Sequence, residues 1–360
     1  MSTIIFDETT VSTLQKQTAQ KPWAAKTGKW KVAVVLAVII PLAITLALML
    51  ATDLPKALIM VVIYLPVQLI AGALAAITTR GKKNALDAVI IVFAIGATIF
   101  SLVVLVSVVW AIITKGIPVL SGAFLSQNMI YISPATPLGY GGIGHAVIGT
   151  VLIVVLSAVV AVPLGVATAV YVTEVRGKAV PYVRFFVQAM SGVPSVVAGL
   201  FILTVFILTG VLKTSALAGA LAYAILMLPT VARTAEEVLK LVPEDLRTGA
   251  LALGSTRARV VLQVVLPAAK TGIITAAILG LARVVGETAP LLLTVGFTDK
   301  TVVNPVTEPI AALPSFIFTY VSSPYPDAVS RAWGAALVLM VLVTVLFVVT
   351  RILTSRRPGR

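Results

Sequence analysis

Apolar runs of 20 residues or more recur along this chain of 360 residues. A run of about 20 apolar residues is long enough to cross a bilayer as a helix. Hydrophobic residues make up 59% of the sequence and charged residues 11%, against about 45–50% and 25% in soluble domains. Because lipid offers no partner to backbone N–H and C=O groups, such runs fold as helices that satisfy those groups internally. We therefore expect an all-α, multi-pass membrane protein.

The runs predict about eight spans, near 31–51, 56–78, 86–113, 143–172, 182–211, 214–233, 270–296 and 332–352. The first two spans would form an N-terminal hairpin over 31–78, preceded by a polar tail at 1–30. The other six would form a second domain over 86–355. Glycine and proline interrupt the fifth run, at Gly192, Pro194 and Gly199, which makes it the least regular of the eight.

The distribution of positive charge predicts the orientation of the chain. If the N-terminus lies in the cytoplasm, 21 of the 27 Lys and Arg residues fall on the inner side, where loops of membrane proteins carry their excess of positive charge. This places both termini and the loop 234–269 inside, and the long loops 114–142 and 297–331 outside. The net charge of +14 then reflects the positive residues of the inner loops, and we expect no nucleic acid partner.

Several kinds of site are excluded by the residues that the chain lacks. It has no cysteine and a single histidine, His145, so a thiolate or histidine metal site and a Ser-His-Asp triad are not expected. No Gly-x-x-x-x-Gly-Lys-Ser/Thr string occurs, so the chain has no phosphate-binding loop for ATP. We expect neither a cofactor nor an enzymatic activity. Two alternatives stay open at this point, a polytopic membrane enzyme and an ion-driven carrier.

A short polar helix is predicted over 243–254, between two apolar runs. Pro243 suits the first helical turn, and the acidic Glu244 and Asp245 suit the positive end of the helix dipole. Gly254 can adopt the left-handed conformation that ends a helix. Apolar residues at a spacing of three to four form one face, namely Leu246, Ala250 and Leu253. A charged helix of this kind between spans is suited to contact a soluble partner, although an ordinary amphipathic surface helix fits the same pattern.

The run 280–296 carries two charges where none is expected. Arg283 and Glu287 are four residues apart, which predicts that they share one face of a helix. Charges at the centre of a span cost at least about 2.5–3.5 kcal/mol, so they need a partner or a watery path. Pro290 removes one helical hydrogen bond. The pair either neutralises itself and locks two helices together, or lines a path for anions.

The polar helix resembles the EAA signature of bacterial ABC importer permeases. Thr248-Gly249-Ala250 stand where that family has Glu-Ala-Ala, whereas Gly254 and Leu266-Pro267 match in type and spacing. The resemblance implies that 243–254 is a coupling helix that docks on a separate ATPase subunit. The residues that it assigns to coupling are Glu244, Asp245, Arg247, Thr248, Gly249, Ala250, Gly254 and Arg257.

The string Arg-Val-Val-Gly-Glu-Thr-Ala-Pro-Leu-Leu at 283–292 narrows the resemblance to the PstA-type permease of phosphate ABC importers. Strings within 141–175 and 311–338 agree with the same family. The PstC-type partner permease has Gly-Glu-Thr-Met-Ala here, so Ala289-Pro290 favours the PstA type. The resemblance covers about 86–355 and leaves the N-terminal hairpin out. It assigns Arg283, Glu287, Thr288 and Pro290 to the substrate path.

This family implies a type I ABC importer permease fold with six core spans, to which the hairpin is added. It also implies import of inorganic phosphate across the cytoplasmic membrane of a bacterium or archaeon, driven by ATP. The partners would be a PstC-type permease, two copies of a PstB-type ATPase, a PstS-type phosphate-binding protein and membrane lipid. The alternatives within transport are a permease for another oxyanion, such as molybdate or sulfate, and the PstC-type partner permease itself.

Overall fold

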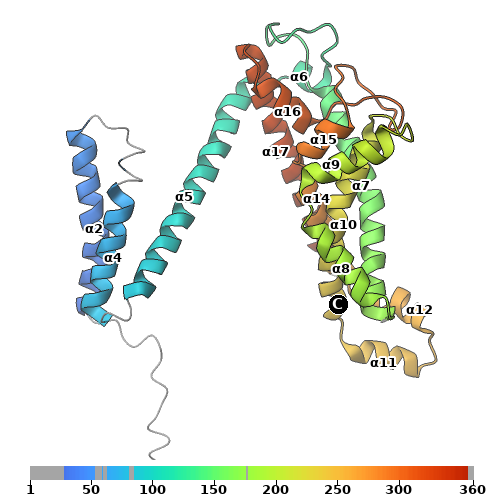
Figure 1. Cartoon of the computed structure of the whole chain (residues 1–360), viewed down its shortest axis with the longest axis horizontal. Helices are drawn as coiled ribbons and strands as arrows, with labels where there is room; N and C mark the ends of the chain where they lie inside the picture. Colours follow the sequence, from blue (N-terminus) through green and yellow to red (C-terminus); the bar gives the residue numbers. More distant parts are fainter. Residues whose placement is uncertain (1–27, 53–58, 60–62, 81–84, 176, 356–360) are drawn as a thin grey trace, which may run out of the picture. The chain divides into compact units, whose positions relative to one another are not determined.

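The computed structural model describes residues 28–52, 59, 63–80, 85–175 and 177–355 (Figure 1). Every regular element in these residues is helical, which confirms the all-α class. The chain forms two compact units, residues 1–108 and 109–360. Of the tail expected at 1–30, residues 1–27 lie outside the described part, and 28–30 already belong to the first helix.

In the first unit, helices α2 (Gly28–Ala51) and α4 (Leu65–Arg80) pack on each other, and α5 (Ala85–Gly116) begins. Pro41 lies inside α2 and has no N–H for the carbonyl of Ala37, four residues before it. The Nε2 of Gln68 donates to this carbonyl over 3.0 Å. A side chain of α4 thus replaces the hydrogen bond that the proline removes from α2, as buried backbone in lipid requires.

The second unit contains the helical segments η3 (Ile117–Val119), α6 (Gly122–Ser126), α7 (Gly144–Val170), η4 (Tyr171–Val175), α8 (Val180–Ser191), α9 (Ser195–Ile202), η5 (Leu203–Ile207), α10 (Ala216–Lys240), α11 (Glu244–Ala252), α12 (Arg257–Val260), η6 (Val261–Val265), α13 (Leu266–Ala268), α14 (Lys270–Val284), α15 (Ala289–Thr294), α16 (Leu313–Val321) and α17 (Pro326–Ser355). Within this unit, α6 and α16 lie at one end and α11 and α12 at the other (Figure 1).

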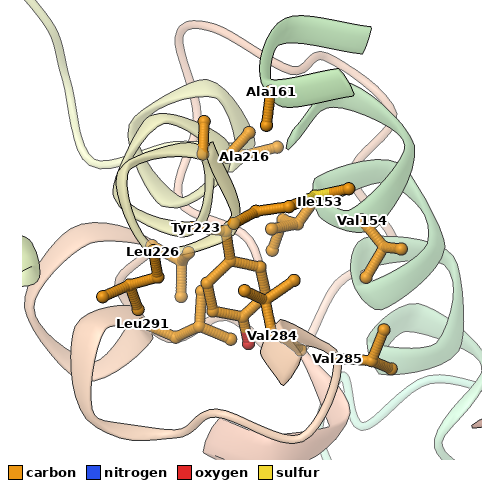
Figure 2. Packing of buried hydrophobic residues seen from close by; sticks show 14 of the residues in the cluster. Ile153, Val154, Ala161, Ala216, Tyr223, Leu226, Val284, Val285 and Leu291 are labelled. Carbon is orange, nitrogen blue, oxygen red and sulfur yellow. The ribbon is translucent and has the colours of Figure 1, made fainter. Parts of the chain in front are cut away.

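Helix α10 is the centre of the second unit, because it packs against α7, α8, α9, α14 and α15. Small residues bring its neighbours close. A Cβ on Gly165 of α7 would lie 2.8 Å from Val231, and one on Gly280 of α14 would lie 2.6 Å from the same side chain. Glycine at such contacts lets helix backbones approach and gain dispersion energy, which drives helix association in lipid. The buried ring of Tyr223 fills the space between α10, α7 and the α14–α15 region (Figure 2).

Among the described residues, five helices are long and apolar enough to cross a membrane, and two bent helix pairs raise the number to seven if each pair is one span. The described residues of the second predicted run hold the shorter helix α4. The run 182–211 is not one straight span, because the chain turns by 103° between α8 and α9. The turn falls at Gly192-Val193-Pro194, where proline removes an N–H and disfavours helix in the residue before it.

The run 270–296 is not continuous either. Helix α14 ends at Val284, and α15 begins only at Ala289. The pair formed by the segment 257–268 and the first of these helices is also bent, by 72°. The prediction of one continuous helix over 270–296 was wrong, because the mostly apolar composition continues across the residues at which the helix stops.

The two loops expected on the outer side are held by short helices and by a buried arginine. Loop 114–142 contains η3 and α6, and loop 297–331 contains α16. The fully buried Arg331 donates from Nη2 to the carbonyls of Thr136, Pro137 and Tyr140 over 2.9–3.0 Å. One side chain of the second loop therefore fixes the backbone of the first.

Candidate functional site

The helix predicted at 243–254 is α11, Glu244–Ala252. Pro243 lies just before the first turn, with φ −56° and ψ 138°, rather than inside it. Glu244 and Asp245 occupy the first turn as expected. Gly254 has φ +82°, and the N–H of Ser255 donates to the carbonyl of Ala250 over 3.2 Å. The helix therefore ends through a left-handed glycine, and this feature of the prediction is confirmed.

The leucine side chains of α11 and of the residue just after it face outward, so the single apolar face expected for Leu246, Ala250 and Leu253 is not formed. Leu246 is 46% exposed, Leu251 42%, and Leu253, just past the helix, 89%. Among the residues expected to meet an ATPase, the exposed ones are Glu244, Asp245, Thr248, Gly249, Gly254 and Arg257. Exposed leucines beside charged residues form a surface suited to a protein partner, since interfaces combine an apolar centre with a polar rim.

Arg247 and Ala250 are the two residues of α11 that are not exposed. Ala250 packs against a cluster formed by Ala169, Leu239 and Val260 with their neighbours. The guanidinium of Arg247 contacts the carboxylate of Glu174 in η4, with Nη2 and Oε1 3.0 Å apart. Both side chains are nearly buried, with 12% and 11% exposed. Arg247 and Ala250 thus face their own chain, unlike the other coupling residues named from the sequence.

A second polar group lines a cavity of about 290 Å³ between α7, α8 and α10. Glu236 accepts from Arg184 at 2.8 Å and from Lys240 at 2.7 Å. Arg233 donates to the side-chain oxygen of Gln188. Three basic residues and two glutamates meet here, so the cavity is polar and carries both signs of charge.

Arg283 and Glu287 do not share a helix face. Arg283 lies in the last turn of α14, and Glu287 lies in the break before α15. Within the described residues they form no ion pair with each other. Arg283 is exposed and Glu287 half-buried. The prediction of one shared face was wrong because the helix ends at Val284, one residue after Arg283.

The break itself is held by packing and by a hydrogen bond from a buried tyrosine of α10. The hydroxyl of Tyr223 donates to the carbonyl of Glu287. Thr288 is the N-cap of α15 and is half-buried, and the buried Pro290 lies in its first turn. A proline in that position loses no helical hydrogen bond, because the first N–H groups of a helix have no partner within it. The broken segment is therefore a defined structure.

The two broken helices meet at their second halves. A Cβ on Gly199 of α9 would lie 2.6 Å from the Cα of Pro290 in α15. This contact brings the Gly192–Gly199 region, singled out in the sequence, next to the Glu-Thr-Ala-Pro string. Irregular backbone at membrane depth is tolerated where it is buried in protein or lines a cavity, and broken helices of this kind surround substrate paths in transporters.

Two residues of the site were missed in the sequence. Glu174 ends the apolar run of α7 and is one of only 13 acidic residues, which was the available signal. Tyr223 lies in an apolar run and carries no local signal, because its partner is 64 residues away. Within the described residues, no group of three or more His, Asp or Glu side chains is placed to hold a metal ion.

Comparisons with known proteins match most of the second unit. The family described as "Binding-protein-dependent transport system inner membrane component" matches residues 161–357. Phosphate transport system permease protein PstA 1 of Mycobacterium tuberculosis H37Rv is 36% identical over 264 residues, which are 73% of this chain and 85% of that protein. The Mycobacterium leprae PstA is 43% identical over 206 residues, 56% of this chain and 67% of its own length.

A more distant organism gives a similar result. The probable PstA of Methanocaldococcus jannaschii is 34% identical over 264 residues, 73% of this chain and 92% of that protein. Among solved structures, the inward facing MetNI methionine ABC transporter covers 61% of this chain with 19% identity and a TM-score of 0.48, a likeness too weak to add to the sequence comparison. The chain therefore belongs to the binding-protein-dependent transport system inner membrane components and, among them, to the PstA-type permeases.

Proposed function

We propose that this chain is one of the two permease subunits of an ATP-driven importer of inorganic phosphate. The observation that carries the proposal is the Arg283–Leu292 string, which lies at a helix break in a chain 34–36% identical over most of its length to relatives named as phosphate permeases. A PstC-type permease would form the other half of the path.

Energy would come from a PstB-type ATPase dimer that docks on α11. The exposed leucines and acidic residues of this helix support such a contact. Its place at the end of the unit opposite α6 and α16 (Figure 1) supports an inner location. The basic residues of the loop 234–269 support the same location. Both termini would lie in the cytoplasm. A PstS-type binding protein would dock outside on the loops 114–142 and 297–331, and the hairpin 31–78 would be an accessory to the permease domain 86–355.

Phosphate would pass the interface with the partner permease beside Arg283. A guanidinium can hold two oxygens of a phosphate at once, and Arg283 is exposed on this chain. Glu287, in the break, would accept the P–OH hydrogen that hydrogen phosphate retains. Sulfate has no such donor at neutral pH and would only be repelled. The pair would thus bind phosphate and exclude sulfate, with Thr288 and Pro290 shaping the break.

Transport would proceed by alternating access between two arrangements of the spans. ATP and the loaded binding protein each shift the equilibrium only as far as they bind one arrangement better than the other. The coupling helix would carry the closure of the ATPase dimer to the spans. This mechanism requires no covalent step on the permease.

Uptake into proteoliposomes that contain all four kinds of subunit tests the proposal. Arg283→Gln is expected to lower phosphate uptake at least about thirtyfold, because removing one side of a charged hydrogen-bonded contact costs about 2–5 kcal/mol. Arg259→Gln, an exposed arginine outside the break, is the matched control and is expected to leave uptake unchanged. Unchanged uptake in Arg283→Gln, or faster uptake of molybdate or sulfate by the unaltered complex, would refute the proposal.

The role of Glu287 has its own measurement in the same vesicles. Glu287→Gln removes the negative charge and keeps the shape of the side chain. We expect sulfate to compete with phosphate in this variant and not in the unaltered complex. Unchanged rejection of sulfate would remove Glu287 from selectivity.

A further inference from the structure

The side-chain contacts between the coupling helix α11 and the rest of the second unit are made mainly by one residue, Arg247. Seven of the nine residues of α11 are exposed, and cavities of about 190 and 520 Å³ lie on two sides of Arg247. The first cavity is lined by residues of α11, α12 and η6, which also contact one another, and the second is lined by residues of α11, α8 and η4. Broad apolar packing therefore does not hold α11 in place. Apart from the small contact of Ala250, the connection depends on Arg247.

All three guanidinium nitrogens of Arg247 are engaged. Nε lies 3.3 Å from both carboxylate oxygens of Glu174, and Nη2 lies 3.0 Å from Oε1 of the same group. Nη2 also donates to the carbonyl of Leu239 over 2.9 Å, and Nη1 donates to that of Val242 over 2.6 Å. A second carboxylate, that of Glu244, lies 3.3 Å from Nη1 on the exposed side. One planar group thus meets three separate parts of the chain.

These partners are the inner ends of two long helices. Glu174 lies in η4, which continues α7, and Leu239 lies in the last turn of α10. The last carbonyls of a helix have no partner within it and carry the negative end of its dipole. An arginine satisfies these carbonyls and pairs with Glu174 at the same time. A lysine has one compact ammonium group and cannot reproduce this fork.

We infer that Arg247 and Glu174 form a strut that transmits the displacement of the coupling helix to α7 and α10. This inference rests on the proposed function and deepens it. Arg247 is then a positioning residue, which acts through the two long helices and does not touch the ATPase. Its loss leaves the exposed docking surface of α11 in place but detaches that surface from the spans.

Three readouts on the complete complex test the strut: retention of the ATPase subunit during purification, stimulation of ATP hydrolysis by phosphate-loaded binding protein, and phosphate uptake. Arg247→Met and Glu174→Gln are expected to retain the ATPase subunit and its basal hydrolysis. Stimulation and uptake are expected to fall about tenfold, in the usual range of coupling between sites. Arg247→Lys is expected to keep only part of the stimulation and uptake that Arg247→Met loses. Arg259→Gln, the exposed control, is expected to behave like the unaltered chain.

Two outcomes overturn the inference. If Arg247→Met loses the ATPase subunit while Glu174→Gln behaves normally, Arg247 is a docking residue. If stimulation and uptake survive in both variants, no strut exists. Should Arg247→Met fail to accumulate in the membrane, Glu174→Gln decides, because it changes the charge and hardly the shape of the side chain.

A distance measurement separates failure of the strut from failure of the proposed function. The chain has no cysteine, so spin labels can be placed at Ala252→Cys and Lys178→Cys alone. We expect one narrow distance that stays the same with and without ATP, and a broad distribution once Arg247→Met is added. This result needs no transported anion, so it holds even if the complex imports something other than phosphate. A broad distribution in the unaltered chain would contradict the strut.

Discussion

Tyr223 connects the centre of the unit to the break between α14 and α15. Its ring is 1% exposed and packs among apolar side chains of α7, α10, α14 and α15 (Figure 2), and its hydroxyl donates to the carbonyl of Glu287. Tyr223→Phe removes only the hydroxyl and leaves that carbonyl without its donor. We expect a loss of about 1–3 kcal/mol in the free energy of unfolding, measured as a lower unfolding midpoint of the purified complex.

The matched control is Tyr182→Phe. Because Tyr182 is 70% exposed, this substitution should leave the unfolding midpoint unchanged. A Tyr223→Phe midpoint equal to that of the unaltered protein would show that the hydroxyl does not hold the break.

At the scale of residues, the sequence identified the unusual charges at 283 and 287 but predicted the wrong geometry for them. Spacing predicts a shared face only if the helix is continuous, and the tertiary bond from Tyr223 is invisible in the local pattern.

At the scale of elements, the contact between α9 and α15 has no room for a side chain at Gly199. A Cβ there would meet the Cα, carbonyl oxygen and Cβ of Pro290 at 2.6, 3.0 and 3.2 Å. Because the backbone must move to accept this Cβ, Gly199→Ala is expected to lower the free energy of unfolding by about 1–3 kcal/mol and to lower phosphate uptake. For Gly192→Ala the atom nearest to the new Cβ is 3.6 Å away, so we expect the free energy of unfolding to change by less than about 0.5 kcal/mol. Equal unfolding midpoints for the two variants would contradict this assignment.

The end of α11 depends on the left-handed backbone conformation of Gly254. Gly254 has φ +82° and open space around its Cα, so Gly254→Ala changes only the conformational energy, by about 1–2 kcal/mol. We expect the α11 amides to exchange hydrogen about fivefold to thirtyfold faster, the ratio that this energy gives. Gly249→Ala, also in open space but inside the helix, should slow the same exchange, because alanine favours helix by up to about 1 kcal/mol. Equal exchange in both variants would exclude the left-handed end as the source of stability.

These elements also show why sequence reasoning succeeded at α11 and failed in the spans. Helix α11 is short and polar, and its ends are marked by local chemistry, proline with two acids at one end and a left-handed glycine at the other. The break at 192–194 is marked locally by Gly192 and Pro194, whereas the break at 285–288 is held by contacts with helices distant in the sequence. An apolar side chain suits the membrane interior both in a helix and in an irregular segment that is buried in protein, so hydropathy does not report where a helix stops.

At the scale of the whole molecule, the loops expected on the outer and on the inner side lie at opposite ends of the second unit, with α16 at one end and α11 at the other (Figure 1). The distribution of positive charge predicts that α11 faces the cytoplasm. Because the chain contains no cysteine, single substitutions can test this orientation in intact cells with a maleimide that does not cross membranes. We expect Ser322→Cys, just after α16, to be labelled from outside, and Ala252→Cys, at the end of α11, to be labelled only after permeabilisation. The cysteine-free parent gives the background. Labelling of Ala252→Cys in sealed cells would place the coupling helix outside, where no cytoplasmic ATPase can reach it, and would end the proposed mechanism.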